Sequence, residues 1–286
     1  MQLLILALVI GVFVHDQYGH VAAAVHDRAP GGSPVRIDSD IGMLALAVLP
    51  YLLLLLIYWW QCRRTMAQLS TARGGRALRR LDLAATATRL IAIVAYAVAL
   101  GMGALTRLRE VIGQQILLDE LLIMLPPLGL VVGCWWVYYP IDRRLRDAAL
   151  ISRLDAGLPV FGIWSRRQYL LAQVRHQVAL LMAPLLVLLA WEELVRDFVD
   201  SRATLLGVQA QLVFVLVGVG GIFLCTPLVM RYVWDTAPLP PGELRDRLVE
   251  MCRHHGVRVR QLLLWRTFGG MINGAVMGFI APVRYI

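Results

Sequence analysis

The sequence has 286 residues, a net charge of +9 and a hydrophobic share of 59%, against roughly 45–50% apolar residues in soluble domains. This composition excludes an ordinary soluble globular protein. The apolar residues gather in runs about as long as a bilayer is thick, which predicts an α-helical polytopic membrane protein.

Five apolar segments are predicted membrane spans, and a candidate sixth lies at the N-terminus. The N-terminal run 3–14 is either the apolar part of a signal peptide or a short span extending toward Val25, and we favour the span. The five predicted spans are residues 41–60, about 90–105, 121–139, about 178–191 and 212–234. Aromatic residues such as Tyr58, Trp59 and Trp60 end these segments, as expected of rings in the headgroup layer.

The charges between the spans predict the orientation. All 28 basic residues are arginine. Loops 61–89 and 140–176 each carry seven arginines, with one and three acids, whereas segments 15–40, 106–120 and 192–207 together carry six arginines and eleven acids. Because positive loops stay in the cytoplasm, the first two loops and the tail after residue 231 are predicted inside a bacterial inner membrane. Anionic lipid is then a better partner for the arginines than nucleic acid.

No charge lies at mid-membrane in the five predicted spans, and Arg231 interrupts the last span only near its end. This pattern argues against a proton-coupled transporter. The acidic pairs Asp119-Glu120 and Glu192-Glu193 are predicted to lie at the membrane interface, with a luminal ion site as the alternative. The four cysteines form no Cys-x-x-Cys pair, and we interpret them as small buried side chains. His254 and His255 are interpreted as cations at a helix C-terminus rather than metal ligands.

The tail changes character after the last span. Residues 1–234 form the predicted transmembrane region, and the proline-rich segment 235–242 is a predicted linker. Residues 243–255 place Leu244, Leu248 and Met251 on one face of a predicted amphipathic helix. Apolar residues 262–265 predict a buried strand, residues 273–280 a second strand rich in small residues, and residues 284–286 the beginning of a third. A sequence that stops inside a strand is expected to be a fragment, because its strand edge and helix face lack partners.

The order of these elements, with the sequences HHGVRVRQLLLWRT, NGAVMGF and APVRYI, resembles the beginning of the peptidase domain of HtpX-like and CAAX-prenyl-protease-like zinc metalloproteases. The resemblance covers about residues 240–286. It implies that residues 243–286 are the incomplete first part of a cytoplasmic α+β peptidase domain, and that the whole protein is a membrane-integrated zinc endopeptidase. The sequence departs from the family at Gly274, where alanine is commoner.

The resemblance also implies a substrate-binding strand, where an extended polypeptide adds to the sheet edge. A structural edge strand is the alternative. The implied substrate-binding residues are Asn273, Gly274, Ala275, Val276, Met277 and Gly278.

No His-Glu-x-x-His sequence occurs in the chain, so its zinc ligands and catalytic residues are not among these 286 residues. The fragment alone is expected to be inactive. The substrates of the whole enzyme would be membrane or membrane-proximal polypeptides. The alternative is a non-catalytic membrane scaffold or an inactive homologue that binds partners.

Overall fold

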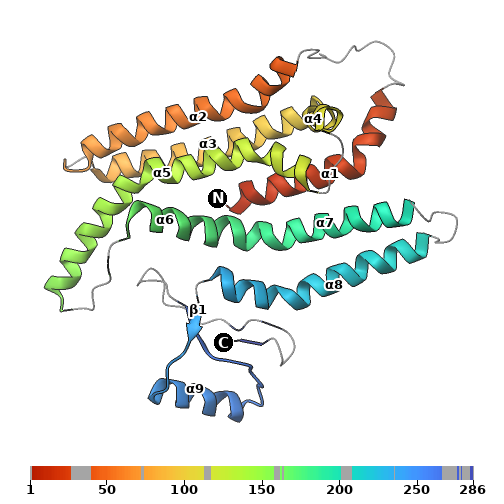
Figure 1. Cartoon of the computed structure of the whole chain (residues 1–286). Coiled ribbons are helices and arrows are strands. Elements are labelled where there is room, and N and C mark those ends of the chain that lie inside the picture. Colours follow the sequence, from red (N-terminus) through yellow and green to blue (C-terminus); the bar gives the residue numbers. More distant parts are fainter. Residues whose placement is uncertain are drawn as a thin grey trace. The chain divides into compact units, whose positions relative to one another are not determined.

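The computed structural model describes residues 2–26, 40–71, 74–112, 117–157, 162, 164–200, 208–234, 236–265, 276, 278, 284 and 285. It is mostly helical, as predicted (Figure 1). The chain divides into two compact units. The first unit comprises residues 1–158 and 163–177, and the second comprises residues 159–162 and 178–286.

Six helices build the described part of the first unit. They are α1 (Gln2–His26), α2 (Asp40–Gln68), α3 (Gly74–Gly101), α4 (Ala104–Ile112), α5 (Leu118–Asp155) and α6 (Arg166–Gln173). Helix α2 packs on α3 and α5, α1 packs mainly on α3, and both α4 and α6 pack on α5. Ser165 caps the N-terminus of α6 in a capping box. Its side chain accepts from the Gln168 backbone N–H, and the Gln168 side chain accepts from the Ser165 backbone N–H.

Helix α1 contributes a buried apolar stripe to the first unit. Leu4, Ile5 and Leu8 are almost fully buried. Gly11 allows Tyr96 of α3 to approach closely, since a Cβ there would lie 3.0 Å from Tyr96 Cε1. The Tyr96 hydroxyl donates to the Leu8 carbonyl at 3.1 Å. The predicted run 3–14 is therefore a packed helix, and this helix continues past Val25.

Among the residues that the structure describes, four helical stretches are long and apolar enough to cross a membrane, judged by length and composition. They are Ala45–Gln68, Gly74–Gly101, Leu118–Asp155 and Arg166–Val195. Each overlaps one predicted span and extends past at least one of its ends, because hydropathy marks the apolar stretch and not the polar turns that continue the helix. Helix α3 ends at Gly101, before the predicted boundary at about residue 105. The last stretch joins α6, the π-helical turn η1 (Val174–Ala179) and α7 (Leu180–Asp200).

The second unit begins with an antiparallel helix pair. Helix α7 packs on α8 (Val208–Val233), which covers most of the predicted span 212–234. Gly218 of α8 lies under the indole of Trp191 from α7, and a Cβ at Gly218 would overlap that ring. Trp191 Nε1 donates to the Phe214 carbonyl at 2.9 Å. Gly218 therefore serves helix packing within one chain, whereas Gly220 and Gly221 have nothing within 4 Å of a built Cβ.

The tail of the second unit holds β1 (Thr236–Pro238), α9 (Glu243–His254) and β2 (Leu263–Trp265). Helix α9 confirms the predicted amphipathic helix. Strand β1 pairs antiparallel with β2, in the register Thr236–Trp265, Ala237–Leu264 and Pro238–Leu263. The segment 235–242 was predicted as a linker, so the strand in it is a correction. Pro238 is tolerated because it ends an edge strand, where no ladder donor is needed.

Candidate functional site

The tail is organised around the strand segment 261–265. Beyond its pairing with β1, this segment forms a parallel bridge between Gln261 and Tyr285. The Arg260 N–H donates to the Arg284 carbonyl at 2.8 Å. Tyr285 is fully buried at this junction. The predicted strand at 284–286 therefore pairs with segment 261–265 through its described residues.

A stacked tryptophan pair fixes the start of the tail to the end of α8. The rings of Trp234 and Trp265 lie 4.7 Å apart at an interplanar angle of 10°. Trp234 follows α8 directly, and its backbone N–H donates to the Met230 carbonyl at 2.9 Å. The strands are thus held at the C-terminal end of α8, the last apolar helix. The tail therefore lies beside any membrane that α8 enters.

Two of the six predicted substrate-binding residues are described by the structure. Val276 is 62% exposed. Gly278 has a φ of +97°, a conformation that suits glycine, and its carbonyl accepts from Arg284 Nε at 3.4 Å. Neither is assigned to a strand. Asn273, Gly274, Ala275 and Met277 lie outside the described residues, so the second predicted strand stays a prediction.

The apolar face of α9 is not covered by any residue that the structure describes. Leu244 and Met251 are exposed, Leu248 and Cys252 are half-buried, and the helix has no buried residue. His254 and His255 end the helix, as predicted, with their rings edge to face. An uncovered apolar face beside a small sheet is available for packing by a further layer.

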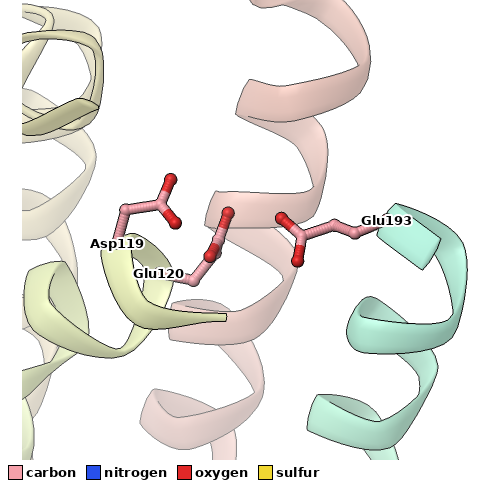
Figure 2. Close-up of side chains that lie close together, drawn as sticks. All are labelled: Asp119, Glu120 and Glu193. Atoms are coloured by element: carbon pink, nitrogen blue, oxygen red, sulfur yellow. The ribbon is translucent and has the colours of Figure 1, made fainter. Parts of the chain in front are cut away.

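The acidic pair Asp119-Glu120 is more deeply buried than the sequence suggested. Asp119 is 0% exposed and Glu120 is 2% exposed. Figure 2 shows both carboxylates projecting from the first turn of α5, and Glu193, also drawn there, belongs to α7 of the second unit. Asp119 accepts from Arg109 Nε, and Glu120 accepts from Arg109 Nη2. The pair therefore forms a buried ion cluster with α4, and its position at the membrane interface stays a prediction.

The backbone before this cluster is strained. Leu117 has φ 62°, the left-handed region that a bulky residue rarely adopts. The turn at Leu117 begins α5 and directs both carboxylates toward the positive end of the helix dipole, which stabilises them. Charge pairing with Arg109 and the helix dipole together offset the cost of the turn.

Arg89 is an ionisable residue within an apolar helix. Helix α3 runs from Gly74 to Gly101 as one stretch long enough to cross a membrane. Arg89 lies near its middle, although the sequence-based span began at about residue 90 and assigned this arginine to the loop. Its Nε is buried and has no hydrogen-bond partner among the described residues. Because Arg89 directly precedes the predicted span, the prediction that the spans hold no charge at mid-membrane stays untested.

No protein-family model, curated protein or solved structure matches the chain significantly. The family resemblance of residues 240–286 therefore stays a prediction.

Proposed function

We propose that this chain is the membrane region, and the first part of the peptidase domain, of a membrane-integrated zinc endopeptidase. The observation that carries the proposal is the architecture of the tail. Helix α9 precedes a strand segment that pairs with residue 285, and the exposed Val276 lies between these two segments in the sequence. This order agrees with the sequences in which residues 240–286 resemble the metalloprotease family.

The apolar helices support a multi-pass membrane protein in this proposal. Arg63 lies over the Trp59 ring at 4.7 Å, and Arg64 over the Trp60 ring at 3.4 Å. Arginine–tryptophan pairs at a helix end suit a headgroup layer, where the ring faces lipid and the guanidinium faces phosphate. Together with the arginine-rich loops, they favour a cytoplasmic position for loop 61–89 and for the tail.

The contribution of this chain to the reaction would be substrate binding. An extended polypeptide needs free main-chain donors and acceptors and no bulky side chains in its path. Of the two described residues, Val276 is exposed and is the candidate contact for an added strand, whereas the Gly278 carbonyl already accepts from Arg284 Nε. Zinc chemistry would activate the attacking water in the whole enzyme. Residues 1–286 contain no His-Glu-x-x-His sequence, so no step of that chemistry is assigned to them.

The first test extends the reading frame. We expect a His-Glu-x-x-His sequence within roughly two dozen codons after residue 286, followed later by a glutamate ligand. The purified whole protein is then expected to hold about one zinc ion per chain, measured by elemental analysis, and to cleave unfolded polypeptides until a chelator removes the metal. A natural stop codon directly after residue 286 would instead support the membrane scaffold.

The second test concerns the substrate strand. In the whole enzyme, Val276→Pro removes one main-chain donor at the exposed edge and is expected to lower kcat/KM about tenfold, the equivalent of one hydrogen bond of about 1.4 kcal/mol. The control Val276→Ala keeps that donor and is expected to stay within about twofold of wild type. Zinc content and thermal midpoint verify that both variants are folded. Equal activities in the two variants would contradict strand addition at this edge.

A further inference from the structure

The first unit contains a cavity between α2, α3, α5 and α6 whose mainly apolar lining includes two charged residues. Its volume is about 430 Å³, within the range of small-molecule sites. Arg89 and Asp82 of α3 line it, together with aromatic residues of the other three helices. The aromatic lining residues are Tyr58, Trp135, Tyr138 and Tyr169.

The charges in this cavity are arranged as a dipole. Asp82 and Arg89 are seven residues apart on one helix, so they share a face and lie about 10 Å apart along the axis. Arg89 cannot lose its proton at physiological pH and offers five N–H donors. Its buried Nε finds no acceptor among the described residues, so an anion with several oxygens would satisfy a donor that is otherwise costly to bury.

The depth of the cavity identifies the class of ligand. Tyr58, Trp135 and Tyr138 belong to the aromatic clusters that end the predicted spans, which places the cavity at the level of the headgroups. Interfacial arginines usually extend outward to water or lipid phosphate. Arg89 instead lines a partly open cavity that also contains an acid and four aromatic rings. Such rings attract an ammonium group through its charge, and Asp82 can accept hydrogen bonds from it.

We propose that this cavity binds the phosphoethanolamine headgroup of a phospholipid. Arg89 holds the phosphate, and Asp82 with the surrounding rings holds the primary ammonium. The apolar part of the lining, which includes Leu78 and Leu145, contacts the glycerol end of the lipid. The same headgroup chemistry is also carried by soluble glycerophosphoethanolamine, and the experiment separates these two sources.

The test titrates lipids into the full chain in detergent and measures bound lipid by native mass spectrometry and the thermal midpoint. Phosphatidylethanolamine at about ten times its Kd is expected to raise the midpoint by about 3–5 °C. Arg89→Gln is expected to weaken its binding about tenfold, whereas Arg80→Gln, an exposed arginine of the same helix, is expected to leave it unchanged.

Selectivity provides a second measurement that does not depend on Arg89. Asp82 is exposed on the cavity rim, so Asp82→Asn is expected to fold normally and to lose the preference for phosphatidylethanolamine over phosphatidylglycerol. Equal binding of these two lipids to the wild-type chain, or no effect of Arg89→Gln on lipid binding, would overturn the proposal. If glycerophosphoethanolamine bound as tightly as the lipid, the site would be assigned to a soluble phosphate ester. That result would overturn the proposal that the ligand is a phospholipid.

Discussion

Replacing Arg109 by methionine is expected to lower the free energy of unfolding of the first unit by about 3 kcal/mol. The substitution leaves the carboxylates of Asp119 and Glu120 buried without their guanidinium partner. A buried charge that loses its partner cannot recover its hydration, so the loss exceeds the value of the pair itself. The unit should also unfold more readily around Leu117, where the turn is strained.

The neighbouring arginine offers a matched control. Arg107 pairs with Glu110 at 2.6 Å, but both side chains are about half exposed. Arg107→Met is therefore expected to cost less than about 1 kcal/mol. Unfolding of this unit can be followed by maleimide labelling of the buried thiols Cys62 and Cys134, with Cys225 and Cys252 changed to serine.

Neutralising Asp119 and Glu120 should reverse the loss of stability that Arg109→Met causes. Adding Asp119→Asn and Glu120→Gln to Arg109→Met removes the uncompensated charges and is expected to restore more than half of the lost stability. If Arg109→Met were no more harmful than Arg107→Met, the cluster would be hydrated and not buried.

The long apolar helices and α9 were predictable because their signal is local, whereas α4 and α6 lie in segments that were predicted as loops. Apolar runs of bilayer length mark the four stretches that can cross a membrane, and the spacing of Leu244, Leu248 and Met251 marks α9. The helix ends were less predictable. Helix α3 begins well before the apolar run at about residue 90, because arginines and alanines continue a helix that hydropathy does not detect.

The polar sites depend on contacts that no local pattern contains. Arg109 and Asp119 belong to different helices, so their pairing follows from the packing of α4 on α5. The cavity at Arg89 requires residues from four helices. In the sequence, Asp82 and Arg89 are seven residues apart, which predicts that they share one face of a helix. This spacing does not predict which aromatic side chains lie opposite that face.

Strand β1 illustrates the same limit in the tail. Residues 236–238 include a proline and have no alternating pattern, so their own sequence predicts a linker. Their strand conformation follows from pairing with Leu263, Leu264 and Trp265, and the stacking of Trp234 on Trp265 brings the two segments together.

The stability of the helix pair α7–α8 should depend strongly on the absence of a side chain at residue 218. Gly218→Ala places a methyl group in the space of the Trp191 indole and is expected to destabilise the second unit by about 1–3 kcal/mol. The ring cannot move away without losing its hydrogen bond to the Phe214 carbonyl. Thermal unfolding in detergent measures the difference.

Gly220 supplies the comparison, because the same substitution there meets no atom within 4 Å. Gly220→Ala is expected to be neutral or to stabilise the helix by up to about 1 kcal/mol, since alanine loses less backbone entropy than glycine. Combining Gly218→Ala with Trp191→Ala should cost less than the sum of the two single changes, because the clash needs both side chains. Additive effects, or equal effects at residues 218 and 220, would show that the indole does not lie against this helix face.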